Sequence, residues 1–229
     1  MQDVDLDLAR REVLGLIGPN GAGKTTLVNI LTGFDMPSAG RVELEGRDVT
    51  RWRPDRRGRN GLARTFQQGH LFGELTVREN VEVAALGAGA WGWEARRRAD
   101  RLLEILGIAS RANAMAALLP HGDERKLGVA RALATEPRFV LMDEPAAGLH
   151  EDEVAEFADV VCTVRDEAGA GVLLIDHNVA LIMDVCDRVH VLDRGATLAV
   201  GTPDEVRRNL DVATAYLGAG TSPVETVDV

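Results

Sequence analysis

The chain has 229 residues, of which 45% are hydrophobic and 27% are charged, and its formal net charge is −10. This length and composition suffice to bury the core of one globular domain, while the acidic balance argues against non-specific binding of nucleic acid, which needs a basic surface. No apolar run approaches the ~20 residues that span a bilayer, so any membrane role is expected to be peripheral.

The segment before residue 66 mixes strand, loop and helix patterns. Short stretches with strand patterns are residues 3–8, 13–17, 41–44 and 62–65. A helix is expected over residues 24–31. Arginines are concentrated between the last two strands: Arg51, Arg53, Arg56, Arg57 and Arg59. We interpret them as a solvated, charged connector, with contact to phosphate or lipid headgroups as the less favoured alternative.

From Thr76 the pattern becomes helical. Thr76 and Glu79 have the spacing of a capping box, which predicts a helix start. Further helices are predicted over residues 94–106 and 122–134. We expect the block of residues 76–134 to form an inserted helical subdomain.

The rest of the chain alternates strands with helices again. Strands are expected over residues 139–142, 172–175, 189–192 and 197–200, and helices over residues 151–167, 203–208 and 211–217. Continuous apolar strands alternating with helices predict a mainly parallel sheet covered on both faces. The chain is therefore expected to be one α/β domain, with residues of about 1–75 and 135–217 as its core and residues 218–229 as a flexible tail.

A glycine-rich segment matches the phosphate-binding-loop pattern G-x-x-x-x-G-K-[ST]. Its residues are Gly18, Pro19, Asn20, Gly21, Ala22, Gly23, Lys24, Thr25 and Thr26. Glycines let backbone N–H groups curl round an anion, the lysine adds positive charge, and the start of the following helix favours the same anion. Because a strand pattern precedes the loop and a helix pattern follows it, the sequence predicts binding of a nucleoside triphosphate.

A phosphate loop needs a magnesium ligand and a group that activates water. The Thr25 hydroxyl is placed to bind Mg²⁺, and Asp143, at the end of a predicted buried strand, is expected to hold the same ion. Glu144 follows directly, and a carboxylate there can orient and polarise the attacking water. The alternative is a structural acidic pair followed by Pro145.

With these motifs, the chain resembles the ATP-binding subunits of ABC transporters over nearly its whole length. The resemblance rests on segments whose order and spacing match: residues 18–26, 64–68, 119–127, 141–149 and 175–177. It implies a P-loop NTPase fold, with a RecA-like core, a small antiparallel β part and the helical block as the signature subdomain. It also implies ATP and Mg²⁺ as ligands.

The resemblance assigns roles to further residues. Gln67 would be the Q-loop glutamine, which reaches Mg²⁺ or the water and senses the membrane partner. His177 would be the switch histidine that contacts the γ-phosphate. The signature segment would be Pro120, His121, Gly122 and Asp123. It opens a helix whose N-terminus contacts ATP held by the opposite subunit, so that two subunits sandwich two ATP molecules.

Three features depart from the family pattern. Pro120 stands where the signature usually has serine, and since it brings neither hydroxyl nor N–H, we expect slower closure or hydrolysis at the facing site. His150 stands where an aspartate is common. No aromatic residue precedes Gly18 to stack on adenine. Either the chain lacks that clamp or a first strand lies upstream, and we favour the second because the chain opens inside a strand pattern.

Within the family the resemblance is closest to branched-chain amino acid importers, on residues 63–67, 71–77, 146–149 and 215–218. It implies a second, different ATP-binding subunit, two transmembrane permease subunits and, indirectly, an extracytoplasmic substrate-binding protein. The chain would then lie at the cytoplasmic face of the membrane, with no nucleic-acid partner. A permease helix is expected to dock near residues 67–75 and the helical block.

Other functions share parts of this pattern. Residues 176–178 are also seen in the lipopolysaccharide-export ATPase, and urea importers are similar over much of the chain. Pro120 and the missing aromatic favour a degenerate or regulatory nucleotide-binding subunit. The intact functional residues oppose that alternative: Lys24, Gln67, Asp143, Glu144 and His177.

Overall fold

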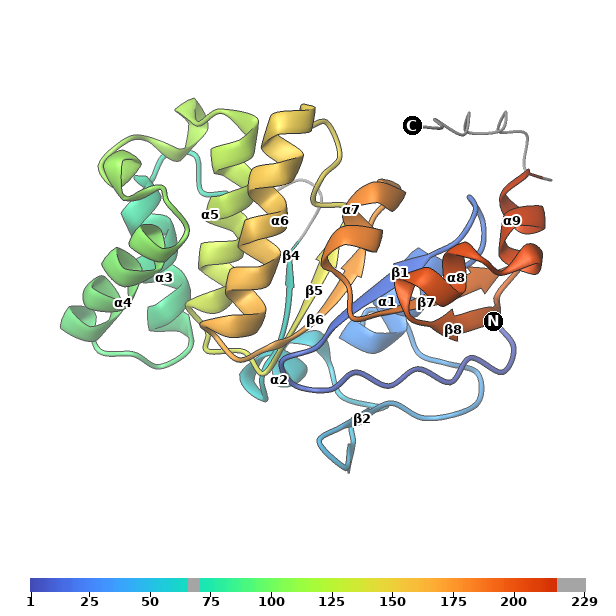
Figure 1. Cartoon of the computed structure of the whole chain (residues 1–229). Coiled ribbons are helices and arrows are strands. Elements are labelled where there is room, and N and C mark those ends of the chain that lie inside the picture. Colours follow the sequence, from blue (N-terminus) through green and yellow to red (C-terminus); the bar gives the residue numbers. More distant parts are fainter. Residues whose placement is uncertain (66–70, 218–229) are drawn as a thin grey trace.

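The structure, a computed structural model, describes residues 1–65 and 71–217 and is built around a mainly parallel sheet (Figure 1). Within these residues the sheet has six strands in the order β4-β5-β6-β1-β7-β8. The strands are β4 (Leu62–Thr65), β5 (Phe139–Asp143), β6 (Gly171–Ile175), β1 (Val13–Ile17), β7 (Arg188–Asp193) and β8 (Ala196–Gly201). All neighbours pair in parallel except β7 and β8, which are antiparallel. The predicted sheet is thereby confirmed.

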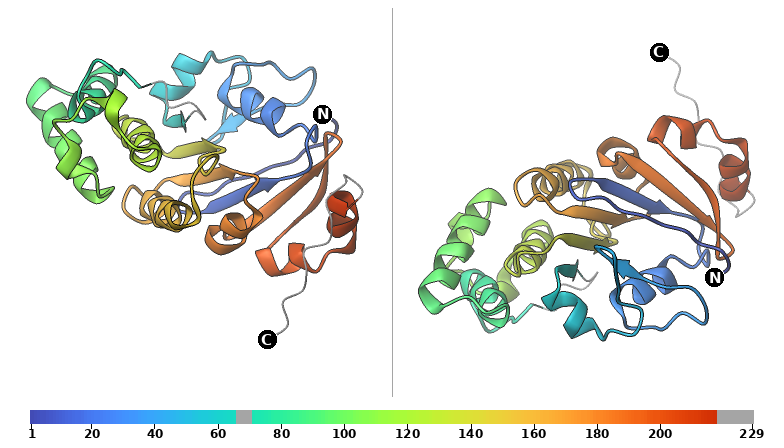
Figure 2. Two further views of the ribbon diagram at one scale, coloured as in Figure 1. Left: turned by 90° about the horizontal axis from the view of Figure 1, so that it is seen from above. Right: turned by 90° about the horizontal axis from the view of Figure 1, so that it is seen from below.

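Both faces of the sheet are covered, as continuous apolar strands require. Successive side chains of a strand point to opposite faces, so Val13 and Ile17 pack into one core cluster while Leu14 and Leu16 pack into the other. Helices α6 (Glu151–Asp166), α7 (Val179–Val185) and α8 (Pro203–Arg207) lie on the first face, and α1 (Lys24–Thr32) lies on the second (Figure 2).

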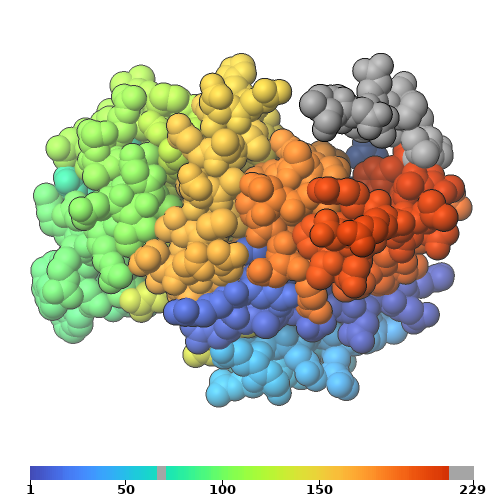
Figure 3. Space-filling view, viewed as in Figure 1, coloured from blue at the N-terminus to red at the C-terminus, as the bar shows by residue number. Residues whose placement is uncertain are grey.

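The expected strand over residues 3–8 is wrong. Val4, Leu6 and Leu8 do pack against the α1 face of the sheet, but their segment is not a strand. The Asp7 carbonyl instead accepts from the Arg188 side chain at 2.9 Å. The alternation in the sequence therefore reflects packing on a sheet face, and the N-terminal part of the chain borders the C-terminal part (Figure 3). The expected strand at 41–44 is reduced to β2 (Glu43–Leu44), paired with β3 (Arg47–Asp48).

The helical block consists of α3 (Val77–Gly87), α4 (Gly92–Ile105) and α5 (His121–Leu133), with short 3-10 turns at Ala109–Arg111 and Ala116–Leu118. The capping box is confirmed, because Glu79 N–H donates to the Thr76 hydroxyl and Thr76 N–H donates to the Glu79 carboxylate. Apolar residues of all three helices join the same core cluster as α6. Whether the block behaves as a separate subdomain stays a prediction.

The arginine-rich connector is only partly solvated. It contains a short helix, α2 (Pro54–Arg59), and Arg57 is 1% exposed. The Arg57 guanidinium donates to the carbonyls of Ile30 and Leu31, both at 2.6 Å, and to those of Trp52 and Thr50. The last carbonyls of a helix have no partner within it and carry partial negative charge. Arg57 supplies both the donors and the charge for α1, so the prediction of a solvated side chain was wrong here.

At the C-terminal end, α9 (Leu210–Leu217) follows α8, and the predicted tail lies outside the described residues.

Arg57→Met should therefore destabilise the fold, because it leaves buried carbonyls without donors. We expect the free energy of unfolding in urea to fall by about 3 kcal/mol. Arg51→Met, at an exposed position of the same connector, is the control and should change it little. Equal unfolding curves for the two variants would contradict the capping role.

Candidate nucleotide-binding site

Several of the predicted site residues, namely the phosphate loop, Asp143, Glu144 and His177, meet at one edge of the sheet because neighbouring parallel strands end there together. Ile175 of β6 is in register with Leu16 of β1 on one side and with Asp143 of β5 on the other. The segments that follow these strands are the phosphate loop, Glu144 and His177. The structure thus assembles residues separated by more than a hundred positions in sequence.

The phosphate loop joins β1 to α1 as predicted. A Cβ atom at Gly18 would lie 2.2 Å from the Leu192 carbonyl oxygen, so a larger residue cannot occupy that position without moving β7. Gly23 caps α1 with φ of 101°, in the left-handed region that favours glycine. The loop is also tied to the β7–β8 turn, since Gly195 N–H donates to the Ala22 carbonyl at 2.9 Å.

Lys24 places its ammonium inside this loop. Its Nζ donates to the Gly18 carbonyl at 2.5 Å and to the Pro19 carbonyl at 3.3 Å, and the residue is 8% exposed. Burial lowers the pKa of Lys24, while the carboxylates of Glu144 and Asp143 act in the opposite direction. The Lys24 ammonium now donates to neutral carbonyl oxygens. Phosphate oxygens, which are charged and therefore stronger acceptors, can replace these carbonyls as its partners.

Asp143 and Thr25, the predicted magnesium ligands, carry oxygen atoms of the kind that Mg²⁺ prefers. Thr25 is exposed in the first turn of α1, and Asp143 ends β5. The Arg64 guanidinium donates to the Asp143 carboxylate, with Nη2 and Oδ2 2.6 Å apart. Sequence reasoning used Arg64 only as part of a family motif and missed this contact, since no local spacing links β4 to the end of β5.

Glu144 and His177 form a direct pair. His177 Nε2 and Glu144 Oε1 are 2.7 Å apart. Glu144 has φ of 48°, a strained conformation for a non-glycine residue of the kind found at functional sites. Its N–H donates to the Ile175 carbonyl at 2.7 Å, which holds the turn after β5 in place. The two side chains predicted to act on water and the γ-phosphate are therefore side by side.

Asp176 links the loops that follow β5 and β6. It is 5% exposed, and its carboxylate accepts from the Ala146 N–H at 2.9 Å and from the Asn178 N–H at 2.8 Å. The Asn178 side chain in turn accepts from the Leu181 N–H and caps α7. Asp176 thus fixes the loops that carry Glu144 and His177, a role that the sequence pattern did not reveal.

The C-terminal helix α9 also reaches the phosphate loop. The Tyr216 phenol accepts a hydrogen bond from the Gly18 N–H, and burial raises its pKa to about 12 despite this bond. In the sequence, residues 215–218 contributed only to the family resemblance and did not predict this contact. The chain gave no other signal, because α9 is far in sequence from the loop that it contacts.

The signature segment lies at the start of α5, against α6, and not at the edge where the three strands end (Figure 1). Pro120 is the N-cap of α5, with φ of −61° and no side-chain cap. A Cβ atom at Gly122 would lie 3.0 Å from Glu153 Oε1. Arg125 donates to the Ala147 carbonyl at 3.2 Å and ties α5 to the loop after β5.

Gln67 and His70 lie outside the described residues.

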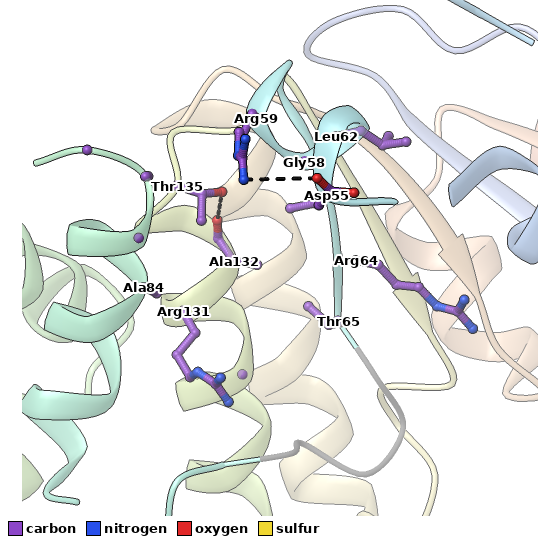
Figure 4. Close-up of a pocket in the computed structure, with 15 residues that line it drawn as sticks. Asp55, Gly58, Arg59, Leu62, Arg64, Thr65, Ala84, Arg131, Ala132 and Thr135 are labelled. Atoms are coloured by element: carbon purple, nitrogen blue, oxygen red, sulfur yellow. Dashed lines mark hydrogen bonds and ion pairs between the residues drawn. The ribbon is translucent and has the colours of Figure 1, made fainter. Parts of the chain in front are cut away.

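A cleft of about 700 Å³ separates α2 and β4 from the helical block (Figure 4). The charged residues that line it are Asp55, Arg59, Arg64 and Arg131. Arg59 and Arg131 belong to opposite walls, on α2 and α5. With Arg59 and Arg131 against Asp55, the cleft is basic overall, and it is distinct from the phosphate loop, whose residues do not line it.

The residues at the strand edge fit a nucleoside triphosphate with Mg²⁺. A glycine position that admits no Cβ, a mostly buried ammonium and a carboxylate–hydroxyl donor set together match the requirements of a phosphate loop. No helix among residues 1–65 and 71–217 is long and apolar enough to cross a membrane.

Comparison with known proteins agrees with this site. The sequence pattern of the ABC transporter family matches residues 1–147, and that of the branched-chain amino acid ATP-binding cassette transporters matches residues 196–221. The high-affinity branched-chain amino acid transport ATP-binding protein LivG of Salmonella typhimurium is 42% identical over 95% of this chain and 91% of its own length.

Two solved structures are similar as well. The ADP conformation of MJ1267, an ATP-binding cassette of an ABC transporter, has a TM-score of 0.83 and 28% identity over 94% of this chain and 91% of that one. The dimeric post-hydrolysis structure of the ATP-binding cassette MJ0796, bound to ADP and Pi, has a TM-score of 0.76 and 26% identity over 87% and 89%.

The fold and the site define a nucleotide-binding protein of the phosphate-loop class. The chain belongs to the ABC transporter family, in which it is an ATP-binding cassette and an ATPase.

Tyr216 is the only tyrosine of the chain, so its ionisation can be followed by tyrosinate absorbance. We expect the native chain to ionise with a pKa of about 12, whereas the chain unfolded in guanidinium should titrate near ~10. Because folding raises this pKa, stability from the neutral phenol is fully present below about pH 10 and is lost as the pH rises through the folded pKa. Tyr216→Phe is the control for background absorbance, and coincident titrations of native and unfolded chain would contradict the burial.

Proposed function

We propose that this chain is the ATP-hydrolysing motor subunit of an ABC importer for branched-chain or other amino acids. The observation that carries the proposal is the Glu144–His177 contact beside the phosphate loop, in a chain that is 42% identical to LivG over nearly its whole length. The match of residues 196–221 to the branched-chain amino acid transporter pattern supports the substrate class.

In this proposal each residue at the strand edge has a separate task. Lys24 and the loop N–H groups bind the β- and γ-phosphates. Glu144 accepts a proton from the attacking water or orients it, and His177 holds Glu144 in place and contacts the γ-phosphate. A bound Mg²⁺, held by Thr25, Asp143 and the proposed ligand Gln67, would neutralise charge on the phosphates.

The proposed assembly is a nucleotide sandwich with a second ATP-binding subunit, which we expect to be a different chain. ATP closes this dimer and hydrolysis reopens it. The start of α5 supports the arrangement, because backbone N–H groups at a helix start favour an anion. Pro120 contributes neither hydroxyl nor N–H, so His121, Gly122 and Asp123 would supply the contacts to ATP on the facing subunit. The dimer of MJ0796 with ADP and Pi provides a related example.

The membrane partners in this proposal are two permease subunits, which receive substrate from an extracytoplasmic binding protein. The basic cleft between α2, β4 and the helical block is the proposed docking place for a permease segment at the cytoplasmic face. Charge favours an occupant with carboxylates, because Arg59 and Arg131 face the cleft from opposite walls and Asp55 is its only acidic lining residue in the described part of the chain.

Glu144→Gln tests the hydrolytic role. We expect ATP hydrolysis to fall by about 10²–10⁴-fold, while an ATP-dependent dimer with the second subunit accumulates in size-exclusion chromatography. Glu104→Gln, at an exposed position of α4, should behave like the wild type. Lys24→Ala should lose both hydrolysis and the ATP-dependent dimer. If wild type and Glu144→Gln dimerise and hydrolyse ATP equally, Glu144 is not the hydrolytic residue.

Charge reversal in the cleft tests the docking surface. Arg59 and Arg53 both pair with Asp55, at 3.9 and 3.5 Å, but only Arg59 lines the cleft. In detergent extracts, Arg59→Glu should reduce recovery of the permease subunits by about tenfold or more, because like charges oppose docking. Arg53→Glu should retain them, and the isolated chain should hydrolyse ATP normally in both cases. Normal assembly of Arg59→Glu would exclude this cleft as the contact.

A further inference from the structure

Arg64 joins three elements around the proposed magnesium ligand. Arg64 is in register with Leu141 of β5, and Asp143 lies two residues further along β5. Because alternate residues of a strand share a face, Arg64 and Asp143 lie on the same side of the sheet as Leu62 and Leu141, whose side chains pack on the α1 face. The contact between the two side chains thus follows from strand register.

The guanidinium is held from two directions. Nη2 donates to Asp143 Oδ2 at 2.6 Å, and Nη1 donates to Asn29 Oδ1 at 3.0 Å and to the Thr32 hydroxyl at 3.4 Å. The Phe34 ring lies 5.8 Å from the guanidinium carbon. Asn29 and Thr32 belong to α1, the helix that begins at the phosphate loop. Arg64 therefore links the carboxylate of Asp143, the proposed magnesium ligand, to α1.

The Arg64–Asp143 pair is well shielded from water. The two side chains are only 12% and 16% exposed. Partly buried charge pairs are weakly screened, so the guanidinium reduces the effective negative charge of Asp143. Lys24 also interacts electrostatically with the Asp143 carboxylate and with Glu144. Lys24 and Arg64 thus together reduce the negative charge of Asp143 and Glu144. This is the place where phosphates and a metal ion would bind.

The backbone of β4 also lies at the cleft. Leu62, Ala63, Arg64 and Thr65 all line it. The Arg64 side chain, however, points away from Arg131 and Ala84 on the opposite wall (Figure 4). Through Arg64, strand β4, which lines the cleft, contacts the carboxylate of Asp143, the proposed magnesium ligand.

We propose that Arg64 is a positioning residue that orients Asp143 and partly substitutes for the metal's charge, thereby limiting how strongly nucleotide binding depends on Mg²⁺. This inference rests on the proposed function. Without the guanidinium, Asp143 repels the phosphates of metal-free ATP more strongly and attracts Mg²⁺ more strongly. The ratio of nucleotide affinity with Mg²⁺ to affinity without it should therefore rise when Arg64 is removed.

The test measures binding and not turnover. The affinity of the full chain for a fluorescent, non-hydrolysable ATP analogue is determined in MgCl₂ and in EDTA. In Arg64→Met the affinity ratio should rise about tenfold, the size expected for loss of one charge-assisted hydrogen bond. Arg64→Lys keeps the charge and should restore most of the wild-type ratio. Asn29→Ala loosens the tie to α1 without removing charge and should leave the ratio unchanged.

The outcomes separate this inference from the proposed function. If Arg64 is only structural, Arg64→Met weakens binding equally with and without Mg²⁺, and an unchanged ratio overturns the inference alone. If the wild-type chain does not bind the analogue under either condition, the proposed function fails first. Circular dichroism of each variant identifies any that do not fold, and if Arg64→Met is one of them, Arg64→Gln removes the same charge and must raise the affinity ratio.

Discussion

The site depends on the register of three parallel strands. Since β1, β5 and β6 are hydrogen-bonded neighbours that end together, the loops after them must share one edge of the sheet. This constraint places the proposed catalytic residues. It brings the phosphate loop beside Glu144 and His177, and it lets buried Asp176 join the two carboxyl-end loops with backbone hydrogen bonds. A shift of one residue in strand register would turn Asp143, the last residue of β5, to the opposite face of the sheet.

The charges at this edge are balanced within the protein. Lys24 is bound to loop carbonyls and Arg64 to Asp143, so the carboxylates are not left to repel an incoming nucleotide. Both cations are mostly buried, which strengthens their fields relative to surface charges. The charges of the site therefore suit an anion bound together with a metal ion.

Contacts made far from the nucleotide keep the phosphate loop in place. Arg57 satisfies the last carbonyls of α1, whose first turn is the end of that loop. Tyr216 bonds to Gly18 from the C-terminal helix, and the β7–β8 turn bonds to Ala22. The loop is consequently supported by segments from both ends of the chain. This explains how a glycine-rich segment, costly to order in conformational entropy, can hold one shape.

The sequence by itself determined the elements and the functional residues whose signals are local. Apolar runs gave the buried strands, the Thr76–Glu79 spacing gave a helix start, and the glycine–lysine pattern gave the phosphate loop. The tertiary structure decided the rest, because those contacts join distant segments: Arg64 with Asp143, Asp176 with Ala146, and Tyr216 with Gly18. Residues 3–8 show the same limit, since alternation specifies a face to bury but not a partner strand. Arg57 is a second example of this limit, because a run of arginines does not indicate which of them donates to the carbonyls at a helix end.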